Sequence, residues 1–286
     1  MTLAEHMPKF LVAGAPRTAT TWLHACMMEH PQIFVPATKE VHFFSFHYDR
    51  GLDWYRAQFA NRRAELAMGE VSPSYMTYPE ADARIFDVNR DMRLLFVVRD
   101  PVERAYSHYC MALRNSSAMS RDIEREMRPE AHFVQEGLYH RHISRFVDRF
   151  GKSQVKIMVY EDLANGSAQY LHEVFSFLGV DSRFQPTVAD TVIHQQKPLP
   201  RSARLNRLRL AVARTRWGAR IHAALQVRGV IDAVHRMRGK RNLGYPVMPP
   251  SLQKRLAEFY EPDVDALSKL LGRDLTFWTN PRARLC

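Results

Sequence analysis

Residues 9–21, KFLVAGAPRTATT, decide how this chain folds. Residues 9–14 are mostly apolar and end in glycine, which predicts a short buried strand. Residues 15–21 form a tight polar turn, and residues 22–30 then place Leu23, Met27 and Met28 at helical spacing. A strand, a phosphate-sized turn and a helix in this order open many nucleotide-binding α/β folds. We therefore expect an α/β protein whose first turn binds an anion.

The rest of the chain supports a parallel sheet. Residues 93–98, RLLFVV, are apolar and branched enough for a central parallel strand covered on both faces. Pro101 suits the first turn of a helix over 102–113. A further strand is predicted at 155–160, and helices at 167–178 and 249–271. No repeat or linker interrupts this pattern, so we predict one α/β domain over residues 1–286, with helices flanking a central parallel sheet and a P-loop-like core.

The first turn differs from the nucleotide loop of kinases and ATPases. That loop ends in Gly-Lys-Ser/Thr, whereas this one ends in Ala19-Thr20-Thr21 and has no lysine. A magnesium-dependent kinase is therefore disfavoured. Backbone N–H groups at the helix start, the threonine hydroxyls and Arg17 still suit an oxyanion. Taken alone, the turn fits a capped helix start with an incidental arginine equally well.

A second polar element follows the strand at 93–98. Arg99 ends that strand, and Ser107 lies eight residues later, two turns into the predicted helix. At the carboxyl edge of a parallel sheet such a pair can hold a second phosphate. Two anion sites on adjacent strand ends suit a nucleotide phosphorylated at both its 5′ and 3′ positions.

With these two motifs in place, the chain resembles the PAPS-dependent sulfotransferases. Residues 16–22, PRTATTW, are similar to that family's 5′-phosphosulfate loop, and the stretch from Arg99 to Ser107 matches its 3′-phosphate motif. The segments KEVHFF (39–44), GLDWY (51–55) and GEVSPSY (69–75) resemble the carbohydrate, heparan-type branch. Further matches are VYEDL (159–163), FLG (177–179), YP (245–246), LGRDL (271–275) and Trp278. The resemblance thus runs in order along nearly the whole chain.

The resemblance implies in-line transfer of a sulfuryl group from PAPS to an acceptor, with PAP as the product and no metal. By position, Arg17 would stabilise the leaving nucleotide. The remaining nucleotide contacts would come from the first loop and helix and from the second motif: Thr18, Ala19, Thr20 and Thr21 for the 5′ phosphate, Trp22 for the adenine, and Arg99 and Ser107 for the 3′ phosphate. The family also closes a basic segment over the 3′ phosphate, and Lys240 and Arg241 fall near that place.

The resemblance also implies the catalytic base. Glu40 matches the carboxylate that the heparan-type branch uses as general base, and His42 matches its neighbouring histidine. To act near neutral pH, Glu40 must lie close to the acceptor and be partly desolvated. The alternatives are that Glu40 forms an ion pair within its loop, with Lys39 as one candidate partner, and that His42 is structural.

Several positions depart from the family pattern. Arg17 stands where many relatives carry lysine, and arginine is a poor proton donor. Ala19 replaces a glycine, which would strain a loop that needs positive φ there. Ser45 and Val71 replace an acidic and a basic residue on the acceptor side, which makes a heparan-like acceptor less expected. The cysteine-closed loop of the Golgi enzymes is missing too, which favours a bacterial-type relative.

Composition limits the class of protein. The 286 residues include three cysteines, too few for a disulfide framework and without metal-site spacing. We see no signal peptide and no apolar run long enough to span a bilayer, so we expect a cytoplasmic protein. The acceptor class stays open between a saccharide or glycolipid and a small hydroxylated metabolite. A non-catalytic nucleotide-binding or basic interaction protein with the same fold is the alternative.

The formal net charge of +11 is concentrated in one segment. Residues 201–241 carry eleven arginines and one lysine against the single acid Asp232. Leu205, Leu208 and Val212 give this segment helical spacing, with arginines on the other face. One interpretation is that this segment packs on the domain. The other is that it contacts an anionic membrane or acceptor, or controls access to the active site. No nucleic-acid motif accompanies it, so we expect no nucleic-acid partner.

Overall fold

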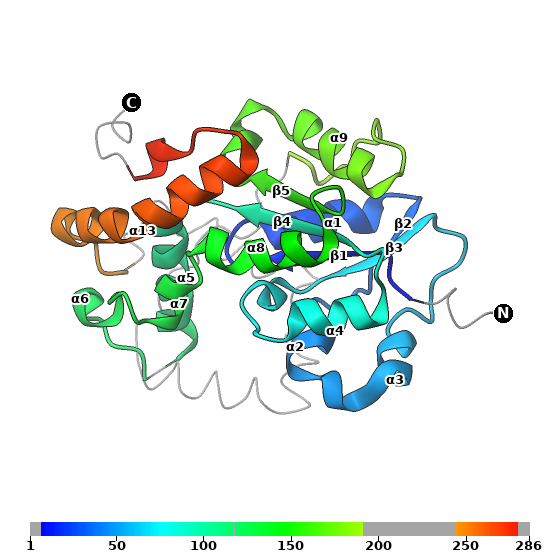
Figure 1. Ribbon diagram of the computed structural model, residues 1–286, viewed down its shortest axis with the longest axis horizontal. Helices are drawn as coiled ribbons and strands as arrows, with labels where there is room; N and C mark the ends of the chain where they lie inside the picture. Colours follow the sequence, from blue (N-terminus) through cyan, green and yellow to red (C-terminus); the bar gives the residue numbers. More distant parts are fainter. Residues whose placement is uncertain (1–6, 117, 191–243, 280–286) are drawn as a thin grey trace, which may run out of the picture.

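A computed structural model describes residues 7–116, 118–190 and 244–279 (Figure 1). Five parallel strands form one sheet in the order β2-β3-β1-β4-β5. The strands are β1 (Phe10–Gly14), β2 (Ile33–Phe34), β3 (Ala67–Val71), β4 (Arg93–Val98) and β5 (Val155–Val159). The α/β fold predicted from the sequence is therefore confirmed.

Helices connect the strands and cover both faces of the sheet. They are α1 (Thr20–Glu29), α2 (Phe43–Phe46), α3 (Gly51–Ala57), α4 (Ala81–Val88), α5 (Pro101–Asn115), α6 (Ile123–Glu126), α7 (His132–Gln135), α8 (Tyr139–Phe150), α9 (Ser167–Leu178) and α13 (Pro250–Leu271). Single 3-10 turns lie at Tyr48–Arg50, Pro73–Met76, Tyr160–Asn165 and Thr276–Trp278. Within the described residues no helix combines the length and the apolar character needed to cross a membrane.

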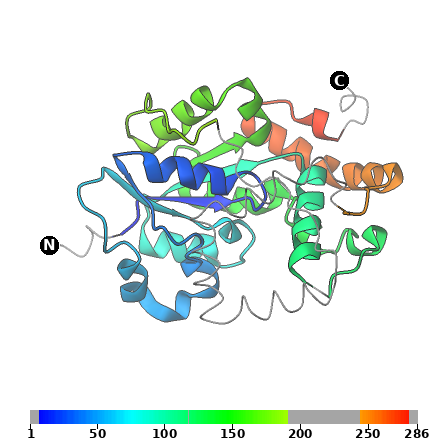
Figure 2. The ribbon, with the colours of Figure 1, turned by 180° about the vertical axis from the view of Figure 1, so that it is seen from behind.

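Successive side chains of each strand point to opposite faces of the sheet, and this alternation builds two hydrophobic cores. In β1, Leu11 and Ala13 pack into one core, whereas Phe10 and Val12 pack into the other. The first core lies under α4, α5, α8 and α13, and Figure 1 shows α4 and α8 across that face. The second lies under α1 and α9, and Figure 2 shows α1 across the opposite face. Because both faces are covered, the strands are buried almost throughout.

The predicted boundaries agree closely with the structure for the strongest patterns. Strand β4 covers 93–98, and α9 ends at Leu178 with Gly179 in the left-handed conformation at φ 75°. Strands β2 and β3 and helix α8 were not predicted. The basic segment 201–241 and residues Lys240 and Arg241 lie outside the described residues, so the single domain over 1–286 stays a prediction.

Candidate active site

The loop after β1 is shaped to receive an anion. Arg17 and Ala19 have positive φ values of 71° and 62°, and the Thr18 hydroxyl donates to the carbonyl of Ala15 at 2.7 Å. The backbone N–H of Ala15 donates to Val97 O at 2.8 Å, and the next one along the described chain with a backbone acceptor is that of Leu23, which follows a run of N–H groups at residues 17–22 and donates to Ala19 O at 3.0 Å. The N–H groups of this run are therefore available to a ligand at the start of α1.

Ala19 adopts the positive-φ conformation for which the sequence analysis predicted strain. Its φ and ψ of 62° and 19° lie in the left-handed region, where a Cβ costs about 1–2 kcal/mol. Backbone strain of this kind is concentrated at functional sites. The loop thus adopts a left-handed conformation at position 19 without a glycine there.

Arg17 joins the two predicted phosphate sites. Its Nε and Nη2 donate to Ser107 Oγ on α5 at 3.2 and 3.1 Å, and Nη1 lies 3.6 Å from Met111 Sδ. No carboxylate among the described residues lies within ion-pair distance of Arg17. Burial lowers the pKa of its guanidinium, and the nearby charges of Arg114 and Arg99 lower it further. A half-buried cation beside other cations is best balanced by an anionic ligand.

Arg99 lies at the end of β4, at the same edge of the sheet. Its guanidinium is 3.5 Å from Glu103 Oε2 and 5.0 Å from the ring centroid of Tyr160. Asp100 caps α5 by accepting hydrogen bonds from the N–H groups of Val102 and Glu103 at 2.9 and 3.2 Å. This cap starts helix α5, which carries Ser107. The end of β4 and the first turns of α5 therefore both face the loop after β1.

The loop 36–42 brings the predicted base to the other side of the first turn. His24 on α1 holds this loop through a 2.9 Å hydrogen bond with the carbonyl of Pro36. Lys39 Nζ donates to Glu40 Oε1 at 3.2 Å and lies 3.4 Å from Thr20 Oγ1. The ion pair between Lys39 and Glu40, which the sequence left as an alternative, therefore forms, and Lys39 also links Glu40 to Thr20 at the start of α1.

Glu40 and His42 are in contact with each other. His42 Nε2 lies 3.3 Å from Glu40 Oε2, and Nδ1 is 2.9 Å from Ser74 Oγ. Burial lowers the pKa of the His42 imidazole, and the charge of Glu40 opposes that shift. Since 30% of the Glu40 side chain is exposed, a ligand can reach its carboxylate.

A buried polar network behind this pair escaped the sequence analysis. Glu70, at the end of β3, accepts hydrogen bonds from Tyr55, Tyr75 and Ser72 at 2.6–2.7 Å. Burial raises the pKa of Glu70 despite these donors. Ser72 in turn accepts the backbone N–H of His42 at 3.1 Å. The network thus holds the His42 backbone in place. In the sequence, its only sign was the family resemblance at residues 69–75.

The remaining predicted residues occupy different settings. Thr20 is buried and Thr21 half-buried in the first turn of α1. Trp22 is buried in the second core, where its Nε1 donates to Ala189 O at 3.1 Å and its ring meets Tyr170 edge-on. The contact of Trp22 with adenine stays a prediction.

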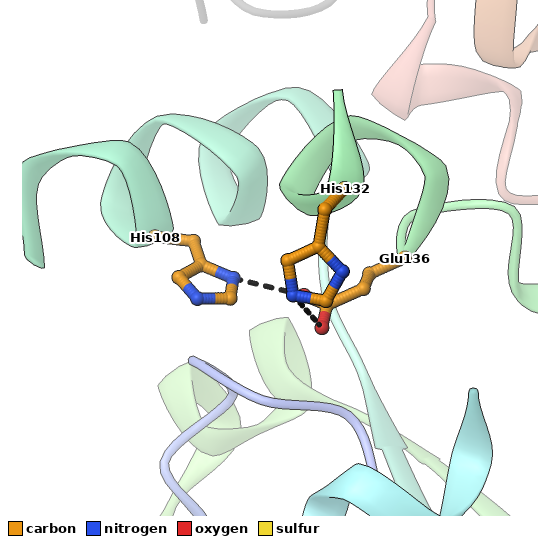
Figure 3. A group of neighbouring side chains, drawn as sticks. All are labelled: His108, His132 and Glu136. Carbon is orange, nitrogen blue, oxygen red and sulfur yellow. Dashed lines mark hydrogen bonds and ion pairs between the residues drawn. The ribbon is translucent and has the colours of Figure 1, made fainter. Parts of the chain in front are cut away.

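A separate cluster joins α5 to α7. His108 Nδ1 lies 2.8 Å from Glu136 Oε2, and His132 Nε2 lies 3.1 Å from Oε1, so both imidazoles point at one carboxylate (Figure 3). The fully buried Arg104 pairs with the same carboxylate at 3.0 Å. These two histidines and the glutamate are the one group of metal-ligand type found among the described residues. Because Arg104 already neutralises Glu136, the arrangement is suited to an ion-pair network.

Three comparisons with known proteins agree on the family. A family model described as "Sulfotransferase domain" matches residues 7–208. The mouse (Mus musculus) heparan sulfate glucosamine 3-O-sulfotransferase 3B1 is 30% identical over 191 residues, covering 62% of this chain and 47% of its own. The membrane-associated sulfotransferase kil1 of Dictyostelium discoideum is 32% identical over 111 residues, covering 38% and 24%. This chain therefore spans less than half the length of these two relatives.

A solved structure extends the similarity over the whole fold. The sulfotransferase from Alicyclobacillus acidocaldarius aligns with a TM-score of 0.68 and 26% identity, over 96% of this chain and 99% of the other. The five-stranded parallel sheet flanked by helices is consistent with that likeness. Since the family model covers more than half of the sequence, the chain belongs to the sulfotransferase domain family, whose enzymes depend on PAPS.

Proposed function

We propose that this protein transfers the sulfuryl group of PAPS to a hydroxyl or amine of an acceptor. The observation that carries the proposal is Arg17, a half-buried cation with no carboxylate partner among the described residues, held between the start of α1 and Ser107. An unbalanced cation between two strand ends fits a nucleotide with phosphates at both ends. The N–H groups of the first turn would hold the 5′ phosphate, and Ser107 with Arg99 the 3′ phosphate.

Each side chain has a role that the geometry supports. Glu40, partly exposed and next to His42, takes the proton of the acceptor as the acceptor oxygen or nitrogen attacks sulfur. Arg17 stabilises the negative charge that develops on the departing phosphate. His42 orients the Glu40 carboxylate, since its own ring is tied to Ser74. Lys240 and Arg241 remain candidates for closing the 3′-phosphate site.

For the acceptor we propose a chemical class. Two curated relatives are sulfotransferases named for heparan sulfate glucosamine or for membrane association. In this chain, however, Ser45 and Val71 replace charged acceptor-side residues, and both are buried. We therefore favour a less anionic acceptor: a saccharide or glycolipid, or a small hydroxylated metabolite. The basic segment 201–241 is a candidate contact for an anionic or lipid-linked acceptor.

The test separates an enzyme from a nucleotide-binding protein. PAP binding is measured by isothermal titration calorimetry for the wild type and Arg99→Ala, and labelled PAPS is screened over saccharide, glycolipid and small-molecule acceptors. We expect the wild type to bind PAP and Arg99→Ala to bind it about tenfold more weakly. Glu40→Gln should lose about 100-fold in turnover while still binding PAP. A wild type that binds PAP but transfers to none of these acceptors, nor to water, would favour the binding protein.

A further inference from the structure

Among the described residues, the Lys39 side chain contacts both the proposed base and the turn proposed for the 5′ phosphate. Its Nζ lies 3.2 Å from Glu40 Oε1, the proposed base, and 3.4 Å from Thr20 Oγ1, in the turn proposed for the 5′ phosphate. Only 13% of the side chain is exposed. The ammonium group is therefore held between the place where the acceptor proton arrives and the place where the leaving group departs.

Arg17 does not fill this position. Its guanidinium is turned toward Ser107 and Met111 on α5, at the side proposed for the 3′ phosphate. An arginine also gives up a proton poorly, because its pKa stays far above neutral pH. Arg17 therefore provides no proton donor for the leaving phosphate.

We propose that Lys39 is a catalytic residue that donates a proton to the departing phosphate. This inference rests on the proposed sulfuryl transfer. The bond between sulfur and the bridging oxygen breaks, and its electron pair stays on that oxygen as the acceptor atom bonds to sulfur. The acceptor proton passes to Glu40, and a proton of Lys39 Nζ passes to the phosphate oxygen. The proton on Glu40 then returns to the neutral amine 3.2 Å away, which restores both residues.

The surroundings of Lys39 favour this role. Burial lowers the pKa of the Lys39 ammonium from its usual 10.5, the charge and hydrogen bond of Glu40 oppose that shift, and the charge of Arg17 adds to it. The imidazoles of His24 and His42 also lie within electrostatic range of Lys39. A proton donor works best when its pKa lies nearer the working pH. A lysine packed among these groups is a better acid than an exposed one.

The experiment compares Lys39→Met and Lys39→Arg with the wild type. Single-turnover transfer from labelled PAPS is measured against pH, with water and with the acceptor found in the screen. Loss of Lys39 should lower the rate constant about 100-fold in Lys39→Met. Lys39→Arg keeps the charge but not the donor, so we expect about a tenfold loss. The wild-type rate constant should fall as alkaline pH removes the Lys39 proton, and this fall should be missing in Lys39→Arg.

Controls keep the inference separate from the proposed function. Lys156→Met removes another lysine–glutamate ion pair, that with Glu173 at 3.0 Å, and should leave the rate constant unchanged. PAP affinity should change less than threefold in both Lys39 variants. If Lys39→Arg turned over like the wild type with the same alkaline fall, the Lys39 assignment would be wrong although the enzyme assignment stood. A wild type that consumed no PAPS would overturn both.

Discussion

Arg17 shows how one side chain can indicate a ligand. Several partly buried arginines among the described residues face a carboxylate, as Arg145 faces Asp82 at 2.6 Å. Arg17 instead contacts a hydroxyl and a thioether. Burying a charge without a partner is costly, so the site is most stable when an anion supplies the missing charge.

Replacing Arg17 should therefore weaken nucleotide binding more than it weakens folding. We expect Arg17→Met to bind PAP about 10- to 100-fold more weakly, because hydrogen bonds to a charged group contribute about 1.5–3 kcal/mol. Isothermal titration calorimetry gives the affinity, and urea unfolding without PAP gives the stability. Arg56→Met, which removes a cation paired with Asp53 on α3, is the matched control and should bind PAP normally. Equal PAP affinities in the two variants would contradict the role of Arg17.

Ala19 stores strain that can be measured. A glycine at φ 62° avoids the Cβ clash but loses more entropy on folding, so we expect Ala19→Gly to raise the free energy of unfolding by about 0.5–1 kcal/mol. Ala19→Val should lower it, since a β-branched residue is disfavoured there. Urea unfolding of the two variants checks both signs. A destabilised Ala19→Gly would show that the loop does not adopt this conformation.

At the scale of elements, Glu136 connects α5 to α7. The Glu136 residue is 5% exposed, and its carboxylate forms an ion pair with the fully buried Arg104. Burial tends to raise the pKa of Glu136, but the hydrogen bond with His108 and the charge of Arg104 outweigh it, so the pKa lies below its usual 4.5. Removing the carboxylate would leave the buried Arg104 charge without a negatively charged partner.

Glu136→Gln should therefore lower the free energy of unfolding by about 3–5 kcal/mol near neutral pH. Because the folded-state pKa is lowered, the stabilisation is present above pH 4.5 and is lost as pH falls through the folded-state pKa. The variant should thus lose less stability than the wild type on acidification below pH 4.5. Urea unfolding at several pH values tests this. Glu80→Gln, from an exposed pair with Arg84, should change stability by less than about 1 kcal/mol.

For the whole molecule, the proposed nucleotide site draws on both halves of the sheet. The turn after β1, the end of β4 and helix α5 come together at the carboxyl edge, and the loop 36–42 adds Glu40. A ligand that bridges these segments binds only the folded chain. Binding must then stabilise the fold by mass action.

PAP should accordingly raise the free energy of unfolding of the wild type. At a PAP concentration 100 times its dissociation constant the gain should be about 2.7 kcal/mol. Urea unfolding with and without PAP measures it, and Arg99→Ala at the same PAP concentration should gain less. An equal gain with AMP, which lacks the 3′ phosphate, would argue against the proposed site at Ser107 and Arg99.

Several elements could be predicted because their signals are local. Strand β4 is an unbroken apolar run, and α9 ends at a glycine that takes a left-handed conformation. Strand β3 was missed because Gly69 and Glu70 interrupt its apolar pattern. The structure explains Gly69: a Cβ there would lie 2.4 Å from Phe10 O on the neighbouring strand. That constraint comes from a strand more than fifty residues away.

The sequence by itself determined the fold class, the family and the two motifs at the strand ends, because these depend on residue order and local spacing. Only the tertiary structure showed that Arg17 turns to Ser107, ninety positions away, and that Lys39 lies between Thr20 and Glu40. It also revealed the Glu70 network behind His42. The physical reason is that a charge's partner and its desolvation are set by contacts between distant segments, which spacing along the chain does not encode.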